Sequence, residues 1–473
     1  MFKKCLVGLA LATVLVATAS AQDAKTVITN ASKPMGVDTL KTVQYSGSGM
    51  DFAFGQAANP SSPWPKFIVK SYTRAINFET PASRVDLVRL QGENPPRGGT
   101  QPLLGEQTQN RTIIVNAGTP WVQQLEIWMI PQGFMRAAAT KNATVETKRM
   151  GGKRYQVVTF MGDNRAKVNG YINDQNLVER IETWIDNPIL GDMLFEALYS
   201  DYKDTGGVQF PMHIVQKQGG YPILDLNVSD VKVNAAVTIE APPAQAAAPA
   251  NPPAQSEKLG DGVYLITGGY AVIAVDFKDY IVVIESGQSE ARALAIIAEA
   301  KRLIPNKPIK YLINTHSHFD HSGGLRAFVG EGTTIITHQI NKAYLEKVLS
   351  QPHTLNPDKA EEAKKKPMVE GMGEKKVLTD GTHVIELYHL QDFRHHDGMI
   401  VAYLPKEKVL LEADGYNATG QFNTGPSSPY FVSLIDNIQR LKLDVERVVP
   451  VHYPADNRVV TMADLMRLMA RTN

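Results

Sequence analysis

The stretch INTHSHFDHSGG, residues 313–324, carries three histidines and an aspartate within six positions: His316, His318, Asp320 and His321. The residues KYLINT at 310–315 form a short apolar run, which predicts a strand that leads directly into this cluster. Side chains two positions apart in an extended or turning segment can converge on one ion, while the adjacent side chains point elsewhere. The spacing therefore predicts a loop that supplies ligands to two metal ions, each of which needs further ligands from distant strand ends.

Three later apolar runs lead into residues that can complete such sites. These candidate ligands are His395 or His396, Asp414 and His452. The predicted strands of this half are 280–285, 310–315, 333–338, 383–390, 399–405, 408–414 and 446–453, and the predicted helices are 289–304 and one near 341–350. Alternating strands and helices indicate an α/β architecture, in which sites gather where strands end and loops begin.

The first half of the chain has a different pattern. Strand-like segments separated by tight Gly or Asn-Asp breaks occur at 154–161, 166–173 and 177–186, and residues 209–234 predict a hairpin that turns at Gly219 and Gly220. Helical patterns are fewer, with one at 40–47 and one at 190–202. These patterns favour a β-rich, antiparallel α+β domain.

A segment rich in alanine and proline separates the two halves. In APPAQAAAPANPPAQ, residues 241–255, twelve of the fifteen positions are alanine or proline, which predicts a semi-rigid linker. A chain of 473 residues is also long for a single core. We therefore expect one domain at 22–240 and another at 256–473. Of the eleven histidines only His213 precedes the linker, so metal or acid–base chemistry is expected in the second half.

Residues 1–21 have the layout of a cleavable secretory signal peptide. Two lysines precede an apolar run from Cys5 to Ala17, and small residues before and at Ala21 form an A-x-A cleavage site. The run is shorter than the about 20 residues needed to span a bilayer. We therefore expect a periplasmic or secreted protein rather than an integral membrane protein.

Two further features limit the chemistry. Cys5 is the only cysteine, so the mature chain would hold a metal with nitrogen and oxygen ligands alone. The formal net charge of +1 gives no electrostatic footprint for a nucleic acid, so a nucleic-acid partner is not expected. The sequence does not specify an oligomeric state.

The segment HSHFDH at 316–321 matches the H-x-H-x-D-H signature of the metallo-β-lactamase fold superfamily, and the later His, Asp and His follow in that superfamily's order and approximate spacing. The resemblance covers about residues 256–473 and implies an αββα sandwich preceded by the β-rich N-terminal domain. It implies one metal site of His316, His318 and His395, a second of Asp320, His321 and His452, and a bridging Asp414. Asp320 is also expected to act in catalysis by contacting a bound water.

The resemblance bears on neighbouring residues as well. It favours His395 over His396, because the superfamily's ligand commonly lies three residues before a glycine, here Gly398. Glu285 matches an acidic residue, usually aspartate, that braces the metal loop from outside the coordination sphere. Tyr416, Asn417 and Tyr430 are either pocket residues or ordinary loop residues. Structural or surface roles are predicted for His338, His353, His383 and His389.

This constellation predicts a zinc-dependent hydrolase with two zinc ions per chain and a small-molecule substrate. Two ions about 3.5–4 Å apart can share a water and lower its pKa towards neutrality. The resulting metal-bound hydroxide would attack an ester, thioester, lactone, lactam or phosphoester bond. Histidine-rich sites suit zinc, and the superfamily's di-iron branch carries Glu where His318 stands. A mononuclear iron sulfur dioxygenase is the alternative within the superfamily.

The N-terminal half resembles, over about residues 150–235, the curved half-barrel of periplasmic lipoprotein carriers, which holds acyl chains. The resemblance rests on KVNGYINDQNLVERIETWID at 167–186 and FPMHIVQKQ at 210–218. It implies that this half presents an apolar or lipid-like substrate to the metal site, with a scaffold or docking domain as the alternative. A further alternative for the whole chain is a binding protein for apolar ligands whose metal domain is only structural.

Overall fold

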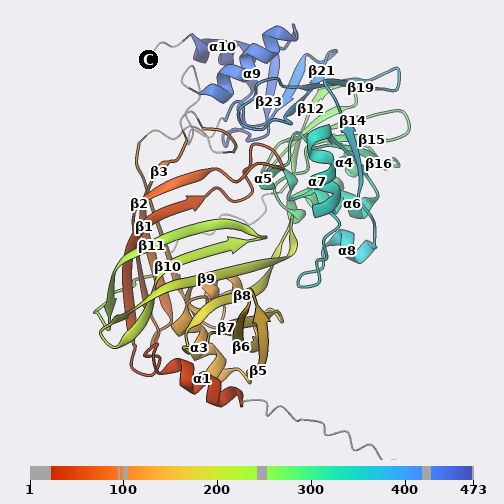
Figure 1. The fold of residues 1–473 in the computed structure, drawn as a ribbon. Helices are drawn as coiled ribbons and strands as arrows, with labels where there is room; N and C mark the ends of the chain where they lie inside the picture. Colours follow the sequence, from red (N-terminus) through yellow and green to blue (C-terminus); the bar gives the residue numbers. More distant parts are fainter. Residues whose placement is uncertain (1–22, 94–95, 100–104, 242–252, 418–427, 471–473) are drawn as a thin grey trace, which may run out of the picture.

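The computed structural model describes residues 23–93, 96–99, 105–241, 253–417 and 428–470. The predicted signal peptide and most of the predicted linker lie outside these ranges, so export and the domain boundaries stay predictions. Two regions of different architecture lie against each other (Figure 1): a β-rich N-terminal region and a C-terminal region with helices on both faces of paired sheets. The predicted fold class is therefore confirmed.

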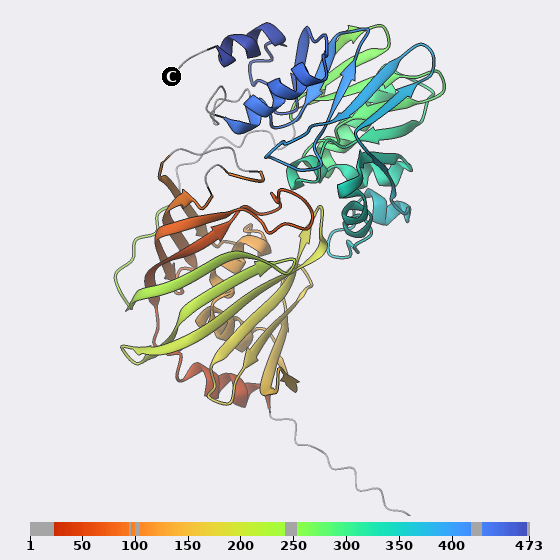
Figure 2. The ribbon, with the colours of Figure 1, turned by 45° about the horizontal axis from the view of Figure 1, so that its top comes forward.

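A single antiparallel sheet of eleven strands forms the N-terminal region, in the order β4-β3-β2-β1-β11-β10-β9-β8-β7-β6-β5. Its strands are β1 (Thr42–Phe52), β2 (Lys66–Asn77), β3 (Ala82–Gln91), β4 (Gln107–Ile114), β5 (Thr144–Met150), β6 (Lys153–Met161), β7 (Lys167–Ile172), β8 (Val178–Asn187), β9 (Gly191–Thr205), β10 (Val208–Gln218) and β11 (Tyr221–Val233). The sheet curves around two helices, α2 (Trp121–Trp128) and α3 (Pro131–Thr140), and α1 (Ala24–Ser32) packs against α3 (Figure 2). This curvature is the shape expected from the resemblance to lipoprotein carriers, whereas acyl-chain binding stays a prediction.

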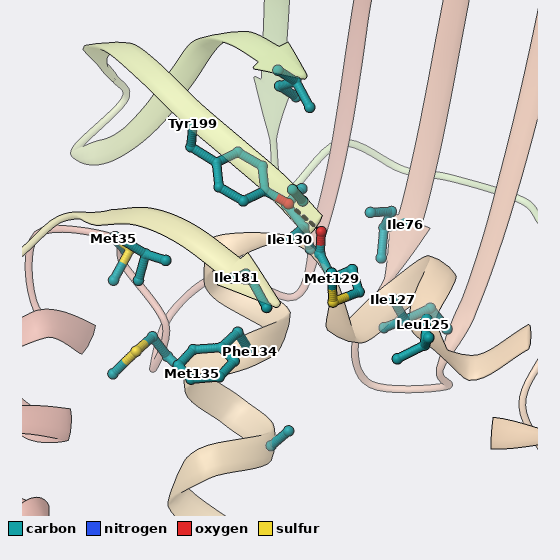
Figure 3. Packing of buried hydrophobic residues seen from close by; sticks show 14 of the residues in the cluster. Met35, Ile76, Leu125, Ile127, Met129, Ile130, Phe134, Met135, Ile181 and Tyr199 are labelled. Atoms are coloured by element: carbon teal, nitrogen blue, oxygen red, sulfur yellow. Dashed lines mark hydrogen bonds between the residues drawn. The ribbon is translucent and has the colours of Figure 1, made fainter. Parts of the chain in front are cut away.

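The core of the N-terminal region lies between the sheet and these helices (Figure 3). Helix α3 begins with Pro131, whose fixed φ suits the first helical position. The ring of Phe134 in α3 is fully buried and packs on Phe160, with ring centroids 5.5 Å apart. A Cβ atom at position 170 would lie 2.2 Å from that ring, so Gly170 is what lets α3 approach β7. Burial of one such aromatic side chain contributes about 1.5–3 kcal/mol.

Two predicted helices of this region are strands instead. Residues 40–47 belong mostly to β1, and residues 190–202 form most of β9. In β9 the side chains alternate between buried and partly exposed, with Met193, Phe195 and Tyr199 on the buried face. Leucine, alanine, methionine and glutamate favour helices, but the period of two lets one face pack on the core. The predicted strands 154–161, 166–173 and 177–186 and the turn at Gly219 and Gly220 are confirmed.

The C-terminal region is built on two sheets packed face to face. The seven-stranded sheet contains, in spatial order, β12 (Gln255–Gly260), β13 (Val263–Thr267), β14 (Val272–Asp276), β15 (Ile281–Ile284), β16 (Ile309–Ile313), β17 (Thr334–His338) and β18 (Met368–Met372). The six-stranded sheet contains β19 (Lys375–Thr379), β20 (Val384–His389), β21 (Ile400–Leu404), β22 (Val409–Glu412), β23 (Arg447–Pro450) and β24 (Val460–Thr461). All seven strands predicted for this half are confirmed, while β12, β13, β14, β18, β19 and β24 were not predicted.

Helices cover the outer face of each sheet. The helices are α4 (Glu290–Leu303), α5 (Phe319–Ser322), α6 (Leu325–Glu331), α7 (Gln339–Val348), α8 (Lys359–Ala363), α9 (Pro429–Arg440) and α10 (Met462–Met469). Apolar residues of α4, α6 and α7 pack on the seven-stranded sheet, and those of α9 and α10 pack on the six-stranded sheet. The four layers are therefore helix, sheet, sheet, helix. Within the described ranges, we find no helix with the length and apolar content needed to cross a membrane.

A loop of the N-terminal region, residues 53–65 between β1 and β2, lies against the C-terminal region; we call it the cover loop. Its Phe54 and Trp64 contact the ring of Phe319 edge-on, with centroids 5.1 and 6.2 Å apart. Gly55 has φ +72°, and a Cβ atom there would lie 2.2 Å from the same ring. Glycine is therefore required for the loop to reach Phe319, which lies between two of the predicted metal ligands.

Candidate metal centre

Three histidines from two loops form a compact cluster, which we call the three-histidine group: His316, His318 and His395. His316 and His318 follow β16, and His395 lies in the loop between β20 and β21. Nε2 of His316 lies 2.8 Å from Nδ1 of His318, which lies 2.9 Å from Nε2 of His395. Three imidazole nitrogens that converge in this way form a donor set that fits a metal ion.

The partners of the ring nitrogens that point away from the cluster also fit an orientation in which the other nitrogens bind a metal. Nδ1 of His316 lies 3.0 Å from the hydroxyl of Thr315, and Nε2 of His318 lies 2.8 Å from the backbone oxygen of Ala57. An N–H that donates to a protein oxygen leaves the other nitrogen free of a proton and able to bind a metal. Burial is the first cause that holds the pKa of His316 well below its ordinary value and lowers the pKa of His318 to about 3. Both rings are therefore neutral.

Beside this cluster lies a second set of ligand atoms, which we call the carboxylate group: Asp320, His321, Asp414 and His452. Nε2 of His321 lies 2.9 Å from Oδ2 of Asp414, and Nε2 of His452 lies 3.0 Å from Oδ1 of the same carboxylate. Burial opposes ionisation of Asp414, but the histidines around it, His395 first, hold its pKa well below the ordinary value. The group thus combines two anionic and two imidazole ligands, which also suits a divalent cation.

Asp414 lies between the two groups. Its Oδ2 is 3.5 Å from Nε2 of His316 and 3.4 Å from Nε2 of His395, in addition to its contacts with His321 and His452. The backbone of Asp414 has φ +62°, which is uncommon for a residue other than glycine. Gly415 and Tyr416 donate backbone hydrogen bonds of 3.0 and 3.2 Å to the buried Glu412, and these bonds hold the turn.

Glu285 braces the loop from inside the domain, as the resemblance implied. It is fully buried at the end of β15, its Oε1 accepts the backbone N–H of Thr315 at 2.8 Å, and its Oε2 lies 3.1 Å from Nδ1 of His321. It therefore fixes both the strand end and the ring orientation of His321. Like Asp414 it has a positive φ, +77°. Residues with such sparsely populated backbone conformations cluster at functional sites.

The cover loop contributes two groups that the sequence did not reveal. The backbone oxygen of Ala57 faces His318, and Nε2 of Gln56 donates a 2.9 Å hydrogen bond to Oδ1 of Asp320. On its other oxygen, Asp320 accepts a 2.9 Å hydrogen bond from the hydroxyl of Tyr270. Asp320 is thus oriented by one residue from each region. No local pattern marks Gln56 in the sequence, because the contact spans 264 residues.

Residues 96–99 of the N-terminal region complete this cover. A Cβ atom at Gly99 would lie 2.8 Å from Cε1 of His318, so a larger residue would collide with the ligand. The backbone oxygen of Gly98 accepts a 2.7 Å hydrogen bond from the hydroxyl of Tyr430, whose ring lies edge-on to His395 with centroids 5.2 Å apart. The three-histidine group is therefore closed off by the N-terminal region.

The carboxylate group has an open side. A cavity of about 420 Å³ borders it, lined in part by Tyr270, Gln288, His452 and Tyr453. The side chains of Asp320 and His452 are 31% and 15% exposed. A small molecule can therefore approach this group from the loops after β13 and β23.

The structure brings all seven predicted ligands together and leaves out His396. Nε2 of His396 lies 2.9 Å from the hydroxyl of Ser317, and its Nδ1 accepts the backbone N–H of Gly398 at 2.9 Å. Tyr416 and Tyr430 are buried beside the site rather than exposed in a loop. Metal binding by the seven residues stays a prediction, since their positions establish proximity and not occupancy.

A sequence model of the metallo-β-lactamase superfamily matches residues 267–452, a segment that contains every predicted ligand. The C-terminal half is a metallo-β-lactamase-fold domain. Solved structures similar to this domain include metallo-β-lactamases from Pontibacter korlensis and Hirschia baltica. The first is 21% identical, with a TM-score of 0.34, and covers 45% of this chain and 95% of its own. The second is 19% identical, with a TM-score of 0.34, and covers 46% and 96%.

A curated protein similar to this chain is the α subunit of 2,4-dinitroanisole O-demethylase from Nocardioides sp. (strain JS1661). It is 23% identical over 209 residues, which make up 43% of this chain and 58% of that protein. The chain thus spans little more than half the length of this relative.

Proposed function

We propose that the protein is a metal-dependent hydrolase with two zinc ions, one in each ligand group. The observation that carries the proposal is Asp414, whose carboxylate reaches His316 and His395 of one group and His321 and His452 of the other. Nitrogen-rich sites with few carboxylates favour zinc among the common divalent ions. Neutral imidazoles in the three-histidine group support a resident cation rather than a proton.

When bound, a pair of such ions would acidify a shared water and polarise the bond to be broken. The chain's own residues then have distinct tasks. Gln56 and Tyr270 hold the Asp320 carboxylate by one hydrogen bond to each oxygen, and the carboxylate so fixed would orient a water. Glu285 accepts a hydrogen bond from Nδ1–H of His321 and so keeps the proton on that nitrogen, which leaves Nε2 directed at the proposed metal position.

The cavity beside the carboxylate group favours a small organic substrate. Its lining combines the aromatic rings of Tyr270 and Tyr453 with the amide of Gln288 and the glycines at 268–269. An ester, thioester, lactone, lactam or phosphoester of modest size would place its reacting bond near His452. Because the O-demethylase relative is named for a methyl aryl ether, an activated aryl ether belongs in the same set of test substrates.

The cellular location that we propose rests on the sequence. The A-x-A site before residue 22 supports export to the periplasm or beyond, where the N-terminal region would help to deliver an apolar substrate. A cavity of about 570 Å³ in that region has apolar residues such as Leu87 and Ile223 beside charged ones such as Asp51 and Arg111, so it would suit a ligand with both an apolar and a polar part.

The test compares metal content and turnover in four proteins: wild type, Asp414→Ala, His318→Ala and His383→Ala as a matched control outside both groups. Elemental mass spectrometry should find two more zinc ions per chain in wild type than in Asp414→Ala. Hydrolysis of a panel of chromogenic esters, thioesters, lactones, β-lactams and phosphodiesters should be lost in the first two variants and kept in His383→Ala. Iron in place of zinc, with oxygen consumption and no hydrolysis, would favour the dioxygenase. Equal metal content in wild type and Asp414→Ala would refute the proposal.

A further inference from the structure

A buried arginine lies behind the wall of the cavity that borders the carboxylate group. Arg292, in the first turn of α4, is 1% exposed. Its Nη2 donates hydrogen bonds of 3.3 and 3.1 Å to the backbone oxygens of Ile266 and Tyr270, which flank the turn at 267–269. Because that turn lines the cavity, the guanidinium lies close to the space where a substrate would bind.

The positive charge of Arg292 has no counter-ion in the described part of the chain. Its Nε and Nη1 atoms are buried and have no hydrogen-bond partner among the described residues. Burial lowers the pKa of Arg292 to about 10, and no carboxylate opposes that shift. The side chain is therefore cationic at neutral pH. A buried charge without a partner is costly, and an anion bound nearby would offset that cost.

The cavity offers no acidic side chain to neutralise this charge. None of the described residues that line it is an aspartate or a glutamate. Glu290 follows the start of α4, but its carboxylate accepts the backbone N–H of Lys359 at 2.6 Å instead. Gln288, which lines the cavity, immediately precedes the N-cap of α4, and the N-terminus of a helix carries a partial positive charge. The electrostatics of this part of the cavity therefore favour an anion.

Two glycines form the wall between Arg292 and the cavity. A Cβ atom at Gly269 would lie 3.2 Å from Nε of Arg292 and 3.4 Å from Nε2 of Gln288, so glycine lets both nitrogens lie close to the wall. Within the described ranges, the backbone N–H groups of Gly268 and Gly269 donate no hydrogen bond. Successive backbone N–H groups that are free in this way can bind an anion.

We propose that Arg292 selects substrates that carry a carboxylate, which would bind beside Gly268 and Gly269 while the reacting bond lies near His452. This inference rests on the proposed function and names its substrate class. A carboxylate has one charge and two oxygens, which match one cation and two N–H groups. Arg292 would act through the backbone of the turn and not on the reacting atoms, so it would determine specificity and not catalyse the reaction.

The experiment compares two chromogenic esters of equal length, neutral 4-nitrophenyl butyrate and anionic mono-4-nitrophenyl succinate. Arg292→Met should lower kcat/KM for the succinate ester by about 10–100-fold, because a charge close to the carboxylate is removed, and should leave kcat/KM for the butyrate ester nearly unchanged. Arg292→Lys should keep most of the preference. Arg302→Met, which removes an exposed charge from the same helix, is the control.

A binding measurement separates this inference from the proposed function. Calorimetry with full-length protein should show tighter binding of succinate than of succinamide, and Arg292→Met should lose that difference. If wild type hydrolyses neither ester, the proposed function fails, and the succinate titration then decides the inference by itself. Arg292→Gln, whose amide can still donate to a backbone oxygen, replaces Arg292→Met if thermal denaturation shows the latter to be unfolded.

Three results would overturn the proposal. An equal loss of kcat/KM for both esters in Arg292→Met would mean that Arg292 only holds the turn at 267–269. No loss for either ester would mean that a bound substrate does not sense the charge. Equal affinity of wild type and Arg292→Met for succinate would mean that the carboxylate binds elsewhere.

Discussion

The three-histidine group and the carboxylate group lie side by side, connected by the contacts of Asp414 with His316 and His395, yet they have opposite surroundings. His316, His318 and His395 are 0%, 1% and 2% exposed, under the cover loop and Gly99. Asp320 and His452 have partly exposed side chains beside a cavity of about 420 Å³. One metal position is therefore closed and the other is open.

The two sides of the site are built by different regions of the chain. The closed side is built with atoms of the N-terminal region, namely the backbone oxygen of Ala57 and the backbone at 98–99, while Gln56 of the same cover loop reaches Asp320 on the open side. The open side is built by loops of the metallo-β-lactamase-fold domain itself, which include Tyr270 and His452. If the proposed function holds, the N-terminal region would act on metal retention and the C-terminal loops on substrate approach.

Replacing the shared residue should have the largest effect, because it damages both groups at once. Asp414→Ala should lower kcat/KM by more than the about 100-fold that the loss of an outer contact can cost, and both zinc ions should be lost. Activity assays at equal protein concentrations would measure kcat/KM, and elemental analysis would measure the zinc content. Asp436→Ala, an exposed residue on α9, is the control. If Asp414→Ala lost only one ion, the two groups would be energetically independent.

Chemical rescue should separate the closed from the open group. Added imidazole should restore activity to His452→Gly, because the vacated position borders the cavity. It should not rescue His318→Gly, which lies beneath Gly99 and the cover loop. Activity measured at increasing imidazole concentration gives the comparison, with wild type to show any inhibition. Equal rescue of both variants would mean that the cover opens freely in solution.

A smaller effect is expected from the cover loop. Gln56→Ala removes the 2.9 Å hydrogen bond to Asp320, and loss of such an outer contact weakens metal affinity by about 10–100-fold. Competition with a zinc chelator would measure the change, and Gln175→Ala, in an exposed turn, serves as the control. An unchanged affinity would show that Tyr270 alone is sufficient to orient Asp320.

The gathering of the seven candidate ligands could be predicted from the sequence, because each follows the end of a strand or lies in the loop after one. The order of His316, His318, Asp320 and His321 after one strand leaves few other arrangements, and Asp414 and His452 also follow buried strands. In the N-terminal region, by contrast, the helix predicted at residues 190–202 is wrong, because these helix-favouring residues lie in a strand. There the alternation of Met193, Phe195 and Tyr199 was the correct signal, since burial of one sheet face outweighs local propensity.

The cover could not be predicted in this way. Gln56 and Ala57 lie in a loop with no metal-binding pattern, and a backbone oxygen such as that of Ala57 has no sequence signature at all. Their role follows only from how the two regions pack. The same holds for Gly99, whose importance lies in the space it leaves beside His318.

The smallest expected effect concerns the far edge of the cover. Tyr430→Phe keeps the ring against His395 but removes the hydrogen bond to the backbone oxygen of Gly98. One such bond contributes about 0.5–1.5 kcal/mol to the free energy of unfolding, which urea denaturation can resolve. Metal content should stay at the wild-type level. A loss of zinc in this variant would mean that the contact holds His395 itself and not only the edge of the cover.

The 264-residue separation between Gln56 and Asp320 has a consequence for biosynthesis. Contacts of such long range form late, after both regions have their own cores, because closing a long loop costs conformational entropy. The three-histidine group would therefore pass through a stage at which it is formed but uncovered. An ion acquired during that stage would be enclosed when the cover loop docks, and its residence time would then depend on the rate at which the two regions separate. Maturation, rather than equilibrium affinity, would decide which ion occupies the closed position.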